Sequence, residues 1–254
     1  MVSERGEMSL FDHLTELRRR LVRVAIVVLI GIILAFIFRG FILEVLMTPA
    51  EGFDTLPNGK PVYTEMTEMI GITMKISLVS GFILALPVLL FESIMFVAPG
   101  LTRKERGYLV FLLPGSVVSF AVGASFGYFV LFPPALNFLL TFGSDVATPM
   151  IRIGNYMNLV INLLFWMGIA FEMPLVIFFL AKIGIVAPRH LTWFRRYAVI
   201  LAFVLGAMIT PTFDPINQSL VALPIIVLFE FSILLARFAA RGKSNSSNID
   251  LSRR

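Results

Sequence analysis

Residues 9–21 read SLFDHLTELRRRL and stand directly in front of the first long apolar run of the chain. Leucine recurs there at helical spacing, at positions 10, 14, 17 and 21, which predicts an amphipathic helix with a narrow apolar stripe. Glu16 can pair with Arg20 one turn later. The basic end of this helix, Arg18 to Arg20 with Arg23, leads straight into hydrocarbon-compatible sequence. By itself, the segment fits an interfacial anchor as well as a binding element.

The composition of the whole chain indicates an integral membrane protein. Of its 254 residues 58% are hydrophobic and 15% are charged, and the mean hydropathy is +0.90. A membrane helix needs about 20 apolar residues, so there is room for roughly six helices and no separate soluble domain. We therefore expect an all-α fold with one membrane domain over residues 1–241. The Ser- and Asn-rich residues 242–254 should form a disordered cytoplasmic tail.

The apolar runs predict six membrane spans separated by polar loops. They lie at about residues 22–38, 76–97, 108–132, 156–181, 197–210 and 216–236. Pro133 and Pro134 should end the third span, so the short apolar segment 135–140 predicts a separate re-entrant or interfacial helix. Residues 50–69 form the longest loop between spans, with several acidic residues in it.

The distribution of basic residues predicts the orientation of these spans. Seventeen of the 21 Lys and Arg residues fall in the N-terminal segment, in two loops (residues 101–106 and 182–196) or in the C-terminal tail. The positive-inside rule places all four regions in the cytoplasm. Two cytoplasmic termini require an even number of spans, and six fits. The net charge of +5 is thereby explained by topology, without a nucleic-acid partner.

Several classes of chemistry have no residues to support them. The chain has no cysteine, and its two histidines, His13 and His190, lie in different polar segments. Thiolate chemistry, a histidine-based metal site and a nucleophile–base pair therefore lack candidates, so we expect no cofactor, no metal and no enzyme activity. The first eight residues include no cleavage site typical of a signal peptide.

One acidic residue, Glu172, falls well inside a predicted span. A carboxylate at the bilayer centre costs about 2.5–3.5 kcal/mol on insertion scales, so it needs a partner or water. It could be a protonated acid bonded within the bundle, a docking point for another helix, or a proton-coupled group. Glu92 and Glu230 also fall in spans, but near predicted cytoplasmic ends, from which they could reach the interface.

Two carboxylates are expected on the cytoplasmic face itself. Glu105 sits in the basic loop RKER (residues 103–106), for which a solvated turn is the default reading, and Glu16 sits before the first span. Two carboxylates on one surface could hold a pair of guanidinium groups by charge-assisted hydrogen bonds. The spacing in the sequence does not by itself show that Glu16 and Glu105 converge.

Three motifs in register resemble the signatures of the TatC family, the multi-spanning receptor of twin-arginine protein export. They are HLxELRxRL (residues 13–21), FxxPGLxxxER (residues 96–106) and FExP (residues 171–174). The resemblance covers about residues 9–238. It implies a cup-like bundle of six helices in the bacterial inner membrane, and a homo-oligomer within a larger complex.

The resemblance also implies roles for single residues. Glu16 and Glu105 would bind the arginine pair of a signal peptide on a folded precursor, with Leu17, Arg18 and Phe96 nearby. Export would use the proton motive force and single-span subunits of the TatA and TatB type. Pro49 would shape the first external loop, and Glu172 would face a concave membrane cavity and the partner subunits. Residues 210–215, TPTFDP, depart from the tighter turn common in the family, which leaves the role of Asp214 open.

An alternative from another class is a small proton-coupled secondary transporter or channel, with Glu172 as a relay. It would account for an intramembrane acid beside a proline-broken helix. It explains neither the acidic and basic helix before the first span nor Glu105 in its loop.

Overall fold

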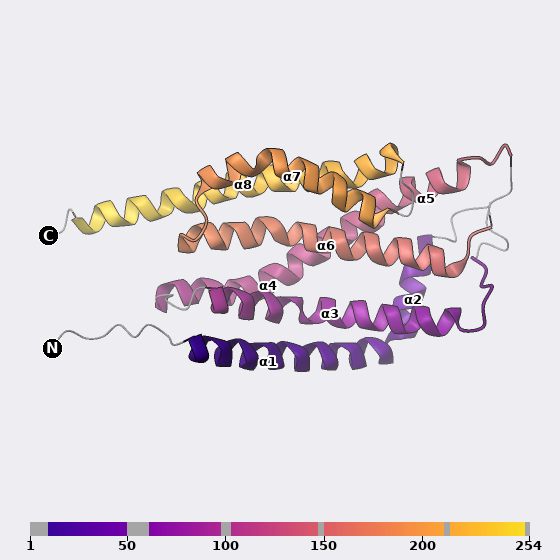
Figure 1. Ribbon diagram of the computed structural model, residues 1–254, viewed down its shortest axis with the longest axis horizontal. Helices are drawn as coiled ribbons and strands as arrows, with labels where there is room; N and C mark the ends of the chain where they lie inside the picture. The colour runs from indigo at the N-terminus through magenta and orange to yellow at the C-terminus, as the bar shows by residue number, and fades with distance from the viewer. Residues whose placement is uncertain (1–9, 50–60, 98–102, 147–149, 211–213, 252–254) are drawn as a thin grey trace.

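The computed structural model describes residues 10–49, 61–97, 103–146, 150–210 and 214–251, and these are helical apart from turns, short connections and one bridge between Val62 and Arg152. The helices are α1 (Leu10–Ile37), α2 (Arg39–Met47), α3 (Glu68–Val97), α4 (Arg103–Phe126), the π-helical η3 (Gly127–Leu131), α5 (Phe132–Thr141), α6 (Ile153–Ile183), α7 (Pro188–Ile209) and α8 (Pro215–Leu251). Most of the long helices run side by side along the length of the molecule, with α2 standing across them (Figure 1).

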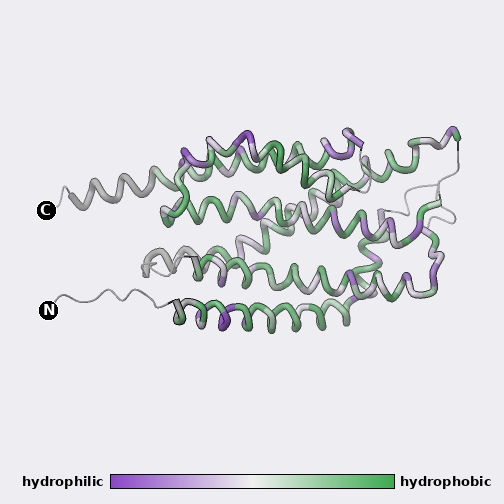
Figure 2. Tube along the Cα trace, viewed as in Figure 1, coloured by the Kyte–Doolittle hydropathy of each residue, from purple (hydrophilic) through white to green (hydrophobic). Residues whose placement is uncertain are grey.

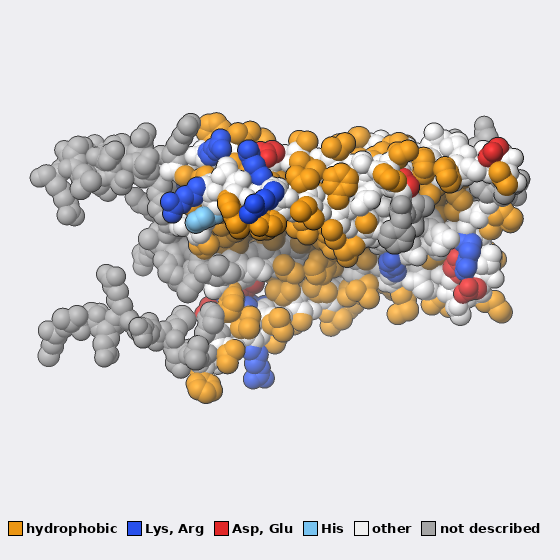
Figure 3. Space-filling view, turned by 45° about the horizontal axis from the view of Figure 1, so that its top comes forward, with side chains coloured by type: hydrophobic (Ala, Val, Ile, Leu, Met, Phe, Trp, Pro, Cys, Tyr) orange, Lys and Arg blue, Asp and Glu red, His pale blue; other side chains and the backbone are white. Residues whose placement is uncertain are grey.

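Among the described residues, six helical segments are long and apolar enough to cross a membrane, which confirms the predicted number. They are Leu14–Ile37, Glu68–Phe96, Leu112–Thr141, Ile153–Ile183, Pro188–Ile209 and Pro215–Ala240. Most extend beyond the predicted spans, because backbone hydrogen bonding continues through the polar turns that flank each apolar run. Hydrophobic residues dominate the long middle parts of these helices (Figure 2), and their side chains cover much of the middle of the molecular surface (Figure 3). The start of α1 and the end of α8 lie at the same end of the bundle (Figure 1).

The third span differs from the prediction. Pro133 and Pro134 do not end it, because they occupy the first turn of α5, where a missing backbone N–H removes no helical hydrogen bond. The five π-helical residues of η3 join α4 to α5 without a loop, so residues 135–140 complete the crossing instead of forming a separate helix.

The C-terminal segment also differs. The backbone of α8 stays helical to Leu251, through most of the tail expected to be disordered. Extending an existing helix avoids the unfavourable nucleation step, so even Ser and Asn can be added at modest cost. Residues 252–254 lie outside the described part of the chain.

The helix α6 stands at the centre of the bundle, where it contacts α3, α4, α7 and α8. The main core forms around Tyr156, Val160, Leu163 and Met167 on this helix, all 0–1% exposed. In contrast, α1 packs chiefly against α3 and lies at the edge (Figure 1).

Two glycines allow α1 and α3 to approach closely. A Cβ atom on Gly31 would lie 2.6 Å from the carbonyl oxygen of Gly81, and one on Gly81 would lie 2.4 Å from the backbone nitrogen of Ile32. Small residues at a contact allow membrane helices to gain van der Waals contact between their backbones. The position of α1 therefore depends on this pair.

A second set of contacts ties the helix ends far from the termini. The Glu68 carboxylate accepts hydrogen bonds from the backbone N–H of Gly154 (2.8 Å) and of Thr64 (3.0 Å). Arg152 forms an ion pair with Glu65 at 2.8 Å, and this hydrogen bond raises the pKa of the guanidinium. We call this set of residues the Glu68 clasp: Thr64, Glu65, Glu68, Arg152 and Gly154. It joins the start of α3 to the start of α6.

The end of α2 is held to the bundle by two tyrosines. The Tyr128 hydroxyl donates to the carbonyl of Val45 (2.7 Å), and the Tyr156 hydroxyl donates to the carbonyl of Leu46 (2.9 Å). The last carbonyls of a helix have no partner inside it, so these bonds satisfy two of them. Pro49 follows in a short 3₁₀ turn, and residues 50–60 lie outside the described part.

Candidate functional site: an ion-pair network at the end of the bundle

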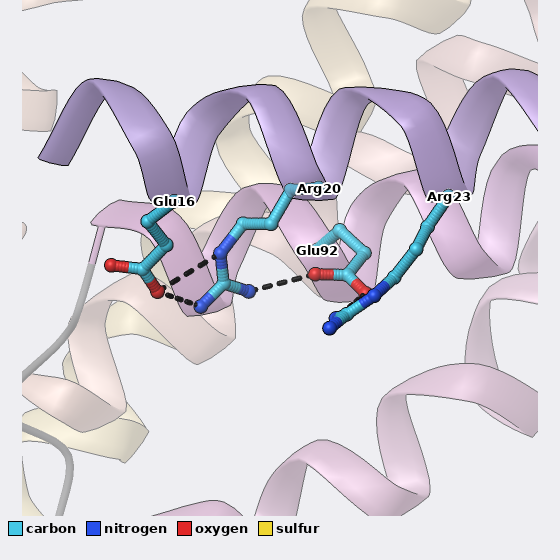
Figure 4. A network of polar contacts seen from close by, with 4 residues as sticks. All are labelled: Glu16, Arg20, Arg23 and Glu92. Atoms are coloured by element: carbon cyan, nitrogen blue, oxygen red, sulfur yellow. Dashed lines mark hydrogen bonds and ion pairs between the residues drawn. The ribbon is translucent and has the colours of Figure 1, made fainter. Parts of the chain in front are cut away.

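Four charged side chains from α1 and α3 form a network near the end of the bundle that holds both termini (Figure 4). Arg20 donates from Nε to Glu16 Oε1 at 3.1 Å and from Nη1 to Glu92 Oε2 at 2.7 Å. Arg23 donates from Nη1 to the other oxygen of Glu92 at 3.0 Å. The predicted pairing of Glu16 with Arg20 is confirmed. Arg20 therefore bridges the two acids.

Burial increases from Glu16 inward along this network. The side chain of Glu16 is 26% exposed, that of Arg20 14% and that of Glu92 9%. Removing one partner of a buried pair leaves an uncompensated charge, which typically costs 3–5 kcal/mol. Two carboxylates and two guanidinium groups balance, so α1 can lie against Glu92 without an unpaired charge.

Glu92 is the residue whose role sequence reasoning missed. From its predicted place near a cytoplasmic helix end, it could have reached the interface. Instead, the residue is 7% exposed and pairs with two arginines of α1. The sequence did hold a signal for this pairing. The second span carries one acid, and the arginine cluster of the first span lies at the same predicted end of the membrane.

The other predicted site residues lie at the same end. Leu17 and Arg18 are exposed on α1, and Phe96 is half-buried in the last turn of α3, four residues beyond Glu92. Glu105 lies in the first turn of α4, which begins at this end of the bundle (Figure 1), and its side chain is outside the described part. Backbone placement thus brings the predicted residues to one end, and the meeting of the two carboxylates stays a prediction.

Glu172 lies inside α6, as predicted, and is only 4% exposed. Neither of its carboxyl oxygens has a hydrogen-bond partner among the residues that the structure describes. One residue earlier, the carbonyl of Phe171 accepts a hydrogen bond from Ser119 of α4 at 2.6 Å. The carboxyl group is enclosed by the chain, so presenting it to a partner requires the surrounding helices to move apart.

Asp214 has a structural role that the sequence left open. Its Oδ1 atom accepts a hydrogen bond from the backbone N–H of Asn217 at 2.7 Å. Pro215 is the first residue of α8, so Asp214 occupies the N-cap position and bonds the N–H of the third helical residue. Residues 211–213 of this turn lie outside the described part.

Comparison with known proteins identifies the family. The family description "Sec-independent protein translocase protein (TatC)" matches residues 12–224, which include all three motifs in full. The TatC protein of Aquifex aeolicus (strain VF5) is 41% identical over 238 residues, which cover 93% of this chain and 98% of that protein. The chain belongs to the TatC family. It is a protein-transport subunit of the Sec-independent translocase, and not an enzyme.

Other TatC relatives agree in sequence and in structure. The TatC protein of Carboxydothermus hydrogenoformans is 38% identical over 231 residues, covering 91% of this chain and 93% of that protein. A crystal structure of the twin arginine translocase receptor TatC is 40% identical, with a TM-score of 0.78, and covers 89% of this chain and 99% of that one. The uncharacterized tatC-like protein ycf43 of Gracilaria tenuistipitata var. liui is 33% identical. TatC membership decides against the alternative of a small proton-coupled transporter.

Proposed function

We propose that the end of the bundle bearing Glu16 is the receptor site for twin-arginine signal peptides of folded precursors. The observation that supports this most directly is the ion-pair network, because it fixes Glu16 as its outermost acid. Glu105 is the second acid of the proposed site. Leu17 and Phe96 would contact the apolar part of the signal peptide. A solved relative is described as a twin arginine translocase receptor, which agrees with this role.

The network suggests how the site exchanges partners. A guanidinium of the signal peptide replaces Arg20 on Glu16, while Arg20 keeps its bond to Glu92. Each carboxylate of the network then still faces a guanidinium. Arg18 is exposed on the same helix. It would repel a positive charge on the part of the signal peptide that faces it, and so would favour peptides without one.

Alanine substitution at the two acids tests this site. Glu16→Ala or Glu105→Ala should weaken precursor binding by roughly 10- to 150-fold, because one charge-assisted hydrogen bond contributes about 1.5–3 kcal/mol. Affinity is measured for a precursor with its arginine pair and for the same precursor with two lysines. Glu44→Ala is the matched control, since Glu44 is an exposed acid on α2.

The two precursors should differ for the parent protein and for the control, and should converge for the Glu16 and Glu105 variants. Affinity within twofold of the parent for both alanine variants would refute the assignment.

The proposed membrane and orientation follow from charge. We infer that the chain resides in a bacterial cytoplasmic membrane with both termini and its two basic loops in the cytoplasm, since most basic residues lie in those regions. The receptor site then faces the compartment in which precursors fold. Assembly into a homo-oligomer with TatA- and TatB-type single-span subunits, and export driven by the proton motive force, belong to the same proposal.

Glu172 is the proposed docking point for a polar group on a partner's single span. Its carboxyl group is buried and has no hydrogen-bond partner among the described residues, which favours a group supplied from outside. Glu172→Gln keeps the size and an acceptor, so it should retain much of the partner crosslinking and export that Glu172→Ala loses.

A proton relay predicts a different ranking, because glutamine cannot titrate. If Gln and Ala variants are equally inactive in export while partner crosslinks persist in both, the docking role is wrong. Binding of the signal peptide, measured in parallel, should stay unchanged in either variant.

A further inference from the structure

A polar pocket opens at the end of the bundle opposite the termini, between α5, α6 and the end of α7. Its volume is about 600 Å³, and three asparagines of α6 line it: Asn155, Asn158 and Asn162. Their spacing of three and four residues places them on one face of the helix. Within the described chain, no hydrogen bond joins the side chains of Asn155 or Asn162 to another residue. Carboxamides at membrane depth need polar partners.

A positive charge stands beside these carboxamides. Lys75 of α3 donates from Nζ to Oδ1 of Asn158 at 2.6 Å. No carboxylate among the described residues lies within ion-pair distance of Lys75. A cation without a counter-ion near the headgroup level attracts anionic lipid groups, so the site favours an anionic ligand.

The depth of Asn155 and Asn158 matches the headgroup region of a bilayer. The 31 residues of α6 extend about 46 Å, whereas the hydrocarbon core is about 30 Å thick. About 8 Å therefore remains at each end of a centred helix. Asn155 and Asn158 lie within this distance of the start of α6, and Asn162 lies about 6 Å below the boundary.

An apolar groove continues from the pocket along the same face of α6. Only apolar residues line it, including Trp166, Ala170 and Met173, and it shares Ile209 with the polar pocket. The volume of the groove is about 270 Å³. A lining that is apolar throughout suits a hydrocarbon chain.

We propose that this pocket and groove bind one phospholipid. Its phosphate and glycerol esters lie on Lys75, Asn158 and Asn162, and one acyl chain follows the groove toward the middle of the bilayer. Lys75 of α3 supplies the charge beside Asn158, and the face of α6 then continues through Asn162 to the apolar groove. No contact in this site involves Glu16, Glu92 or Glu172, so it is separate from the proposed receptor and docking sites.

Native mass spectrometry of the purified protein with added phosphatidylglycerol tests the proposal. Asn158→Asp keeps the size and can pair with Lys75, yet repels a phosphate. Lys75→Gln removes the cation. Each should lower phosphatidylglycerol affinity about tenfold, the loss of one charge-assisted bond. Asn137→Asp is the matched control, because Asn137 is exposed on α5 outside the pocket, and it should bind lipid as the parent does.

A second substitution tests the acyl-chain groove alone. Ala198→Leu fills the groove and should weaken binding of long-chain phosphatidylglycerol while leaving a dihexanoyl lipid unaffected. Equal lipid affinity of the parent, Asn158→Asp and Lys75→Gln would overturn the proposal. The proposal would also be overturned if Ala198→Leu bound lipid as the parent does but lost a co-purified single-span subunit. That result would identify the groove as a protein-docking surface.

Discussion

Single carboxylates in this chain act in different ways, according to what lies within hydrogen-bond distance. Asp214 and Glu68 bond backbone N–H groups at helix starts, and Glu92 pairs with two guanidinium groups. Glu172 has no partner among the described residues. The pairing of Glu16 with Arg20 was predictable because both lie on one helix. The role of Glu92 was not, since it depends on the alignment of α1 with α3.

Gly154→Ala should destabilise the protein by disrupting the Glu68 clasp. A Cβ at position 154 would lie 2.6 Å from Glu68 Oε1, and the flexible carboxylate would swing aside. The cost is then the lost hydrogen bonds to a charged group, about 1.5–3 kcal/mol. Thermal unfolding in detergent measures the effect.

Gly71→Ala is the control for that experiment, because nothing lies within 4 Å of a Cβ at this helical position. It should raise stability slightly, by about 0.5–1 kcal/mol, since alanine favours a helix over glycine. Equal midpoints for the two variants would show that the clasp contributes nothing.

At the scale of helices, the contact of α1 with α3 combines two features. The glycine pair sets how close the helices lie, and the bonds of Glu92 with Arg20 and Arg23 fix their alignment along the axis. The unbroken run of α1 from its amphipathic segment into the membrane was predictable from leucine spacing. The continuation through Pro133 was not, because a proline pair predicts a helix end unless a π-helical segment precedes it.

Gly81→Ala should separate α1 from α3 at this contact. The added Cβ would meet the backbone of Ile32, which no rotamer change can relieve, so overpacking of about 1–3 kcal/mol is expected. A lower unfolding midpoint and weaker precursor binding should appear together, because the proposed site depends on α1. Gly40→Ala serves as the control, with open space around its Cβ. Normal precursor affinity in a destabilised Gly81→Ala protein would separate the site from this contact.

For the whole molecule, the number of spans was predictable from hydropathy and charge, whereas the arrangement of the helices was not. Six apolar helices offer many pairings of similar energy, and nothing in the first span's sequence indicates that it stands at the edge while α6 is central. The asparagines of α6 likewise could not be recognised as part of a binding site from sequence, because Lys75, which contacts Asn158, lies on another helix.

Labelling of introduced cysteines tests the proposed orientation of the whole chain. Lys60→Cys should react with an impermeant thiol reagent added to intact cells, and Lys243→Cys should not, because the positive-inside rule retains the basic tail in the cytoplasm. After membrane disruption both should react. Reaction of Lys243→Cys alone, or of both, in intact cells would contradict the orientation.

The edge position of α1 bears on how the protein is made. This helix is synthesised before its chief contact, α3, which does not begin until residue 68. Of the six spans, it is the most apolar and the least enclosed by the rest of the chain. It can therefore remain stable in lipid alone while the next helix is synthesised. When Glu92 enters the bilayer, Arg20 and Arg23 of α1 are already in place to pair with it, which lowers the free-energy cost of inserting a carboxylate.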